Sequence, residues 1–163
     1  MDRLASSVKM HPIGVVRNGR TEIEDDDWGA VESVIDLTDA LGADALAGIE
    51  EFSHAEVVFY FDRVPDEKIE SGARRPRNNP AWPEVGILAQ RGKNRPNRIG
   101  LTTCEVVGRD GASLRVRGLD AIDGTPVLDI KPVMREFLPR GEVRQPEWAT
   151  ELMRGYWVRA VDS

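Results

Sequence analysis

Short runs of apolar and β-branched residues, each closed by a tight turn, recur along most of this chain of 163 residues. The clearest pair, 99–108 and 112–119, flanks Asp110-Gly111, and an Asp-Gly pair between two such runs is typical of a β-hairpin. Further runs of this kind lie at 11–18, 30–37, 55–64, 84–90 and 123–131. Many short strands joined by short turns, with little helix between them, favour a closed or nearly closed β-barrel.

Two segments have a helical pattern instead. Residues 38–52 place apolar side chains at helical spacing, with Thr38 as the N-cap and Gly48 near the helix end. Residues 146–157 form a second, shorter candidate that begins at Pro146. We therefore predict a mainly β fold, a single β-barrel with one or two short peripheral helices.

The same pattern predicts one domain over residues 1–163, without an internal linker. Its motif-bearing core is expected at about 11–133 and a C-terminal extension at 134–163. Within the core, residues 65–83 are rich in proline, arginine and asparagine and are predicted to form a long loop.

Composition excludes several classes of protein. No apolar run approaches the roughly 20 residues of a membrane span, and the first residues lack the apolar core of a signal peptide. The only cysteine, Cys104, has no disulfide partner and is expected to be a small buried residue in a cytoplasmic protein. His11 and His54 lie far apart without a metal-ligand spacing, so no metal is expected. GxSxG, the P-loop and GxGxxG are all absent.

Positive charge is concentrated in the middle of an otherwise acidic chain. The net charge is −6, yet residues 71–100 hold seven basic side chains and one acidic side chain. The seven are Arg74, Arg75, Arg77, Arg91, Lys93, Arg95 and Arg98. Such a segment is either a solvated loop or a site for phosphate, carboxylate or an RNA backbone. Six of the seven are arginines, and the planar guanidinium group favours the anion site.

Two polar turns carry the remaining chemistry, "QRGKNRPNRIG" at 90–100 and "GLDAIDGTPVLDIKP" at 118–132. In the second, Asp129 and Lys131 have the same parity within a predicted strand, so they share one face and suit a polar pocket near the barrel mouth. Arginines on one turn and aspartates on the other could together bind a zwitterion such as S-adenosylmethionine.

These two turns resemble the TrmO family (YaeB or VirR-like proteins), whose pattern contains RPN-x-IG and later D-x-x-DGTP and DIKPY. The segments "IGVVRN" and "GIEEFSHAEVVFYF" are also similar to the family's first strand and its helix-to-strand junction. The resemblance implies a β-barrel that works as a homodimer, with S-adenosylmethionine bound near the interface. It also implies methylation of N6-threonylcarbamoyladenosine in the tRNA anticodon loop.

The resemblance assigns roles to individual residues. Cofactor contacts are implied for Asp62, Arg63, Arg91, Leu101, Asp120, Ala121, Ile122 and Asp123. The polar wall of the site, facing the substrate, is implied for Arg95, Asn97 and Lys131, and Arg74 and Arg75 are expected to contact the RNA backbone. If the acceptor is an N–H group, Asp129 and Asp123 are the candidates for a catalytic base.

The chain also departs from the family pattern. Val133 replaces the tyrosine after DIKP, Arg98 replaces a proline, and the acidic segment 22–29 stands where relatives carry an RQPG-like stretch. The additional C-terminal domain of longer members does not fit in this length. Two alternatives therefore stay open: methylation of a small-molecule acceptor, and a barrel that binds the cofactor without turnover.

Overall fold

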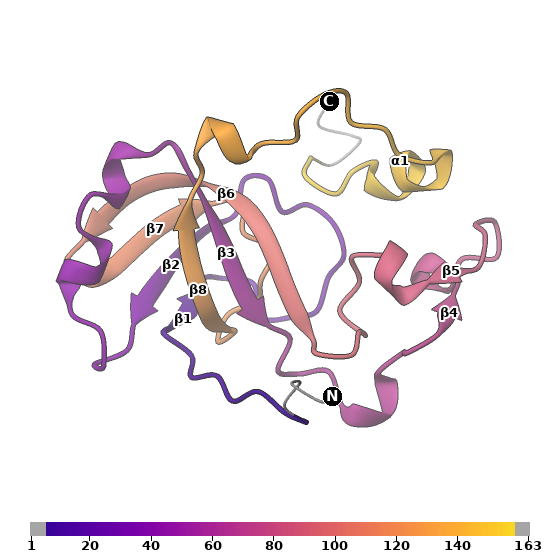
Figure 1. The fold of residues 1–163 in the computed structure, drawn as a ribbon, viewed down its shortest axis with the longest axis horizontal. Helices are drawn as coiled ribbons and strands as arrows, with labels where there is room; N and C mark the ends of the chain where they lie inside the picture. The colour runs from indigo at the N-terminus through magenta and orange to yellow at the C-terminus, as the bar shows by residue number, and fades with distance from the viewer. Residues whose placement is uncertain (1–5, 159–163) are drawn as a thin grey trace, which may run out of the picture.

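The computed structural model describes residues 6–158, and six of its strands form a closed antiparallel barrel (Figure 1). Around the barrel the strands follow the order β1-β2-β7-β6-β3-β8, and β8 pairs with β1 to close it. Their bounds are β1 Gly14–Arg17, β2 Glu32–Leu37, β3 His54–Tyr60, β6 Ile99–Asp110, β7 Ser113–Arg117 and β8 Pro126–Pro132. The predicted fold class is confirmed, and β6 and β7 form the hairpin predicted around Asp110-Gly111.

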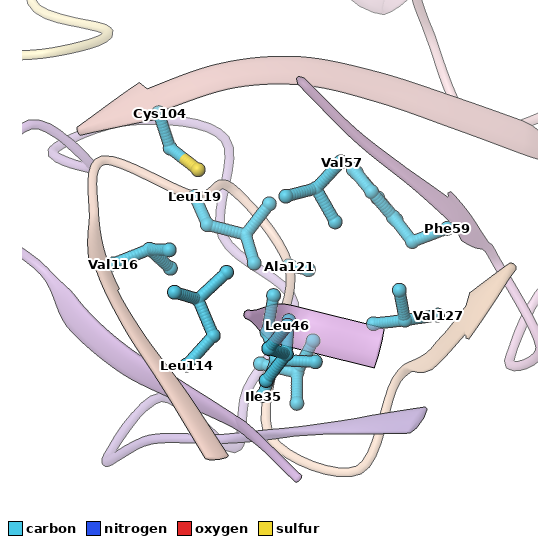
Figure 2. Packing of buried hydrophobic residues seen from close by; sticks show 11 residues of the cluster. Ile35, Leu46, Val57, Phe59, Cys104, Leu114, Val116, Leu119, Ala121 and Val127 are labelled. Atoms are coloured by element: carbon cyan, nitrogen blue, oxygen red, sulfur yellow. The ribbon is translucent and has the colours of Figure 1, made fainter. Parts of the chain in front are cut away.

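The barrel interior is filled by alternate side chains of the strands. In β3, Ala55, Val57 and Phe59 are buried, while the residues between them are partly exposed. Leu119 and Ala121, from the connection between β7 and β8, point into the same interior (Figure 2). Because burial of apolar side chains drives folding, these two residues anchor their connection at the barrel rim.

One glycine of the basic turn is required by the core. Gly100 of β6 lies directly opposite Phe59 of β3, whose ring covers the glycine. A Cβ atom at Gly100 would lie 2.4 Å from Cε2 of Phe59, closer than packing allows. The IG pair of the motif therefore serves the fold.

The predicted helix over 38–52 is wrong. The structure has two 3-10 helices there, η1 (Ala43–Leu46) and η2 (Ile49–Glu51). Gly48 between them has a φ of 92°, a left-handed conformation that ends one turn and starts another in a new direction. The left-handed conformation that Gly48 can adopt therefore interrupts the segment, although its apolar residues have helical spacing.

The predicted strand over 84–90 is also wrong in most of its length. Within this range only β5 (Val85–Gly86) is a strand, and η5 (Ile87–Ala89) follows it. The predicted loop 65–83 contains three short elements: η3 (Asp66–Lys68), β4 (Ala73–Arg74) and η4 (Pro76–Asn78). β4 and β5 pair as a two-stranded sheet outside the barrel.

The C-terminal part leaves the barrel and then returns to it. After η6 (Arg135–Phe137) the chain runs to α1 (Glu147–Met153), which lies on the same side of the barrel as β4 and β5 (Figure 1). The indole of Trp82 donates a hydrogen bond of 2.7 Å to Glu151 and ties α1 to this outer layer. This α-helix was predicted from Pro146, although it is shorter than expected.

Residues 155–157, here called the C-terminal strap, follow α1. The backbone N–H groups of Asp27, Trp28 and Gly29 donate in succession to the carbonyl oxygens of Gly155, Tyr156 and Trp157. Three successive bonds fix the strap along the loop before β2.

Candidate functional site

A cavity of about 80 Å³ opens at the end of the barrel where β3 ends and β8 begins. Three segments and Lys93 form its walls: the loop before β2, the end of β3 with the turn after it, and the β7–β8 connection. The lining residues are Ile23, Glu24, Trp28, Phe59, Phe61, Asp62, Arg63, Val64, Lys93, Asp120, Ala121, Ile122 and Thr125. Five of the residues with implied cofactor contacts meet here: Asp62, Arg63, Asp120, Ala121 and Ile122.

Asp120 is the carboxylate with the most contacts in this site. It lies between the buried residues Leu119 and Ala121, so its backbone is fixed by the core. The hydroxyl of Thr102 donates to Oδ1 of Asp120, and the hydroxyl of Tyr156 donates to Oδ2. A carboxylate can accept about four hydrogen bonds, so acceptor capacity remains for a ligand.

The phenol of Tyr156 is held in its neutral form. Burial raises its pKa well above the ordinary value, and the charge of Asp120 and its hydrogen bond act in the same direction. The positive charges of Arg77 and Arg91 act on this pKa in the opposite direction and do not outweigh burial. Tyr156 therefore remains a hydrogen-bond donor at neutral pH.

Asp62 and Arg63 follow β3 at the cavity mouth, and both are exposed. Nη1 of Arg63 donates a 3.1 Å hydrogen bond to the carbonyl oxygen of Thr21. This contact leaves the remaining donors of the guanidinium group for an anion. The two residues thus supply a negative and a positive group on adjacent positions.

Arg91 and Leu101 lie together but do not line the cavity. Nη2 of Arg91 donates to the carbonyl oxygen of Leu101 at 2.5 Å, and the Leu101 side chain is 45% exposed. The structure therefore brings these two predicted contacts to each other, on the surface beside the site.

Asp123 is predicted both as a cofactor contact and as a base, but its carboxylate and its backbone N–H form hydrogen bonds within a turn. Its Oδ1 accepts a 3.0 Å hydrogen bond from the backbone N–H of Asn18, and its own N–H donates to the carbonyl of Arg20. The Asn18 side chain also bonds the carbonyl of Ala121 at 2.8 Å. These bonds attach the β7–β8 connection to the end of β1, and Asp123 does not line the cavity.

Asp129 and Lys131 share a face, as their parity predicts, but it is the outer face of the barrel. Their charged groups lie 3.8 Å apart, and both side chains are more than half exposed. A bulge in β8 is the physical reason, because Asp129 pairs with Val58 while Val127 pairs with Phe59. The extra residue changes which parity points inward, so the structure does not bring this pair to the cavity.

Most of the basic side chains brace their own loops. Arg95 donates to the carbonyl of Gln90 at 2.8 Å, and Arg75 donates to that of Trp82 at 2.5 Å. Arg98 bonds the carbonyl of Val64 and pairs with Asp66, and Arg77 pairs with Asp25 and Asp26. Among residues 6–158, Nε of Arg74 is buried without a hydrogen-bond partner. Asn97 is exposed and does not line the cavity. Lys93 is the basic side chain of this segment that lines the cavity.

The arrangement suits a small zwitterion with an apolar part. Carboxylates at Asp62 and Asp120 can face a cationic group, while Arg63 and Lys93 can face a carboxylate. Phe61, Trp28 and Ile122 supply apolar surface. Within the part of the chain that the structure describes, no group of acidic, histidine or cysteine side chains could hold a metal ion. That part also contains no helix long and apolar enough to cross a membrane.

Sequence reasoning missed Tyr156 as a site residue. The three aromatic residues Trp148, Tyr156 and Trp157 suggest interface anchors or core positions, and nothing in their spacing indicates a bond to Asp120. Tyr156 and Asp120 are separated by 36 positions in the sequence and meet because the strap packs beside the β7–β8 connection. A hydrogen bond between residues so far apart in the sequence leaves no pattern in the residues around either of them.

Comparisons with known proteins agree with the barrel fold. A family model described as the tRNA-methyltransferase O N-terminal domain matches residues 23–137. The tRNA (adenine(37)-N6)-methyltransferase of Mus musculus is 39% identical over 93 residues, which are 57% of this chain and 21% of that protein. A protein of Methanothermobacter thermautotrophicus named "Probable S-adenosyl-L-methionine-binding protein" is 35% identical over 137 residues, 80% of this chain and 93% of that protein.

A solved structure is similar over most of the chain. The crystal structure of TrmO from Pseudomonas aeruginosa superposes with a TM-score of 0.72 at 25% sequence identity. The match covers 90% of this chain and 64% of the other. This chain thus spans about a fifth of the mouse protein's length and somewhat under two thirds of the solved chain.

Proposed function

The chain belongs to the tRNA-methyltransferase O family, and from this premise we propose that it is an S-adenosylmethionine-dependent methyltransferase. Its proposed substrate is tRNA, and the proposed product carries a methyl group on N6 of threonylcarbamoyladenosine in the anticodon loop. The name of the mouse relative supports the reaction, and the name of the Methanothermobacter thermautotrophicus relative supports the cofactor.

The observation that carries the proposal is the cavity at the barrel end. It collects three carboxylates, Glu24, Asp62 and Asp120, and two cations, Arg63 and Lys93, around an apolar surface. Glu24 is paired with Arg20 at 2.7 Å, which leaves Asp62 and Asp120 for a cationic group of a ligand. S-adenosylmethionine is a zwitterion with an additional sulfonium charge and an apolar adenosine part, so these residues fit it. They come from separate segments of sequence, and the closed barrel brings them together.

S-adenosylmethionine, when bound, supplies a methyl carbon already activated by the sulfonium group. The residues of this chain have to bind, orient and shield the reacting groups, since positioning alone lowers the barrier of a displacement. Asp62, Arg63, Asp120 and Lys93 would orient the charged groups, and Trp28 and Phe61 would exclude water from the apolar part.

We retain Asp129 and Asp123 as candidate bases, although their contacts weaken the case for proton removal. Asp129 pairs with Lys131, and Asp123 accepts from the backbone of Asn18. We also retain Arg91 and Leu101 as cofactor contacts, and Arg95 and Asn97 as substrate contacts, at the surface beside the cavity. The main contribution proposed for this chain is therefore orientation.

Methyl transfer can be tested directly with the whole protein. Donor labelled in its methyl group is incubated with bulk tRNA or with a small-metabolite extract, and digested nucleosides are separated by mass. We expect the label on threonylcarbamoyladenosine. Label only in the metabolite extract would replace tRNA by a small acceptor, and binding of the donor without any transfer would leave a barrel that binds without turnover.

We propose in addition a homodimer. The cavity of about 80 Å³ is smaller than the roughly 300–1,000 Å³ of common ligand sites, so one chain supplies only part of an enclosure. The segment after β8 exposes large apolar side chains, including Phe137 at 79% and Val143 at 68%. Exposed apolar groups in one segment favour contact with another protein surface, here a second copy.

The dimer predicts a mass twice that of the 18.1 kDa chain in light scattering at micromolar concentration. Phe137→Asp should shift the mass toward the monomer, whereas Arg140→Asp in the same exposed segment should not. A wild-type mass of one chain would contradict the dimer.

We further propose a cytoplasmic protein that forms one domain. Cys104 is an unpaired thiol, the state that a reducing compartment preserves. The proposed domain spans 1–163 with a C-terminal extension from 134, and residues 1–5 and 159–163 lie outside the described residues.

A further inference from the structure

Among the side-chain hydrogen bonds of residues 6–158, one joins the C-terminal strap to the β7–β8 connection, and its donor is the hydroxyl of Tyr156. It donates to Oδ2 of Asp120, while Thr102 of β6 donates to Oδ1. The two donors come from separate elements, β6 and the C-terminal strap, and each bonds a different oxygen of the same carboxylate. We propose that Tyr156 is a positioning residue that fixes the carboxylate of Asp120 to receive the ammonium group of the methyl donor.

The geometry of the strap supports a positioning role. Its backbone is fixed by three hydrogen bonds from residues 27–29, and the Tyr156 ring packs edge-on against Trp157, with centroids 4.9 Å apart. The ring is therefore held by its own neighbours, and the hydroxyl is free to act on Asp120. Trp28, which donates to the strap, also lines the cavity, so the strap and the cavity share a wall.

The electrostatics point the same way. Two neutral hydroxyl donors bond both oxygens of Asp120 without cancelling the charge of the carboxylate, whereas an arginine partner would cancel it. The carboxylate keeps acceptor capacity toward the cavity, which Asp120 lines. A fixed anion in a partly buried site is complementary to a primary ammonium group.

This inference rests on the proposed function, because it concerns the same cofactor. Its test uses two ligands that differ at one end. S-adenosylhomocysteine carries the ammonium and carboxylate groups, whereas 5′-methylthioadenosine keeps the nucleoside and the thioether but lacks both. Binding of each is measured by calorimetry, so the readout does not depend on turnover.

Tyr156→Phe removes the hydroxyl and keeps the ring. We expect the dissociation constant for S-adenosylhomocysteine to rise about 10-fold, the range for a hydrogen bond to a charged group, while that for 5′-methylthioadenosine stays unchanged. The chain has one other tyrosine, Tyr60, whose ring lies under Arg98 and does not line the cavity. Tyr60→Phe is therefore the matched control and should bind both ligands as the wild type does.

A double-mutant cycle separates action through Asp120 from a direct effect. In an Asp120→Asn background, Tyr156→Phe should add little further loss, because the charge that the hydroxyl orients is gone. An undiminished loss in that background would overturn the positioning role, as would equal losses for both ligands. If the wild type binds S-adenosylhomocysteine and Tyr156→Phe binds it equally well, this inference fails and the proposed function stands. If the wild type binds neither S-adenosylmethionine nor its product, both fail.

Discussion

Asp120 shows how a single residue acquires a role from its neighbours. Leu119 and Ala121 are buried in the barrel, and this fixes the backbone on both sides of the carboxylate. The DxxDGTP motif thus combines core residues with one group at the cavity. The spacing of its aspartates is explained by two separate tasks, since Asp120 faces the cavity and Asp123 closes the turn.

The same scale shows where prediction from sequence stops. Parity along β8 predicts that Asp129 and Lys131 share a face, and they do. Which face it is depends on one bulged residue, and a bulge is set by the pairing of β8 with β3. Pairing partners are not readable from β8 alone, so the direction of these side chains could not be predicted.

Cys104 gives a pH-dependent prediction. Burial, and then the charge of Asp120, raises the pKa of its thiol to about 12, and Sγ lies 3.5 Å from the carbonyl oxygen of Ala55. The folded pKa is above the unfolded value of about 8.5, so the thiol's contribution to stability is complete below pH 8.5 and is lost as the pH rises toward 12. The free energy of unfolding should therefore fall more steeply between pH 9 and 11 in the wild type than in Cys104→Ala.

Urea denaturation at several pH values measures this difference, and the comparison with Cys104→Ala subtracts the titration of all other groups, Tyr156 included. A thiol reagent at pH 8 should label Cys104 only in denaturant. Fast labelling of the native protein would show that the thiol is accessible or ionised.

At the scale of elements, backbone conformation and strand pairing decide more than the propensity of the side chains does. Residues 38–52 have the apolar spacing of a helix, but the left-handed Gly48 divides them into η1 and η2. Strands are predicted well where β-branched residues alternate, as in β3 and β6. The segment 84–90 fails because five of its residues do not meet a partner strand.

Gly29 provides a prediction for the strap. A Cβ atom there would lie 2.4 Å from the carbonyl oxygen of Trp157. This oxygen belongs to the backbone, so no side-chain rotation can relieve the clash. Gly29→Ala should therefore displace the strap and remove the Tyr156 hydroxyl from Asp120. Trypsin should cut faster after Arg154, and the dissociation constant for S-adenosylhomocysteine should rise in the same direction as in Tyr156→Phe.

Gly42→Ala is the matched control, because no atom lies within 4 Å of a Cβ at that position. It should leave both the cleavage rate and ligand binding at the wild-type level. Unchanged proteolysis of Gly29→Ala would show that the strap tolerates the methyl group, and the tight fit would then have no functional consequence.

At the scale of the whole molecule, the basic segment is less exposed to partners than its composition indicates. Arg77 and Arg98 are paired with acidic groups, and Arg95 braces its own turn. Arg74 and Arg75 remain the best placed for RNA, because no ion pair neutralises either among residues 6–158. An acidic molecule can thus keep a local basic surface beside its cavity.

Charge reversal of this pair tests whether RNA is the substrate. In Arg74→Glu/Arg75→Glu, we expect the KM for tRNA to rise about 10-fold while kcat and the affinity for S-adenosylhomocysteine stay near wild type. Because each lost phosphate contact removes about one unit of slope, the log–log dependence of tRNA binding on salt should also become shallower. Arg75 donates to the carbonyl of Trp82, so Arg75→Gln, which can keep that bond, shows how much of the loss comes from charge alone.

The control must change the net charge equally at another place. Lys9→Glu/Arg115→Glu does so at two exposed positions that do not line the cavity and lie outside the segment that carries the proposed dimer contacts. An equal rise of the KM for tRNA in the two double variants would mean that only the net charge matters. RNA would then not bind specifically at Arg74 and Arg75. Wild-type turnover on tRNA in Arg74→Glu/Arg75→Glu would reject this surface. A loss of tRNA affinity in Arg74→Glu/Arg75→Glu alone would place the RNA backbone between the β4–β5 sheet and the cavity. An anticodon loop could present its base to the cavity from that side.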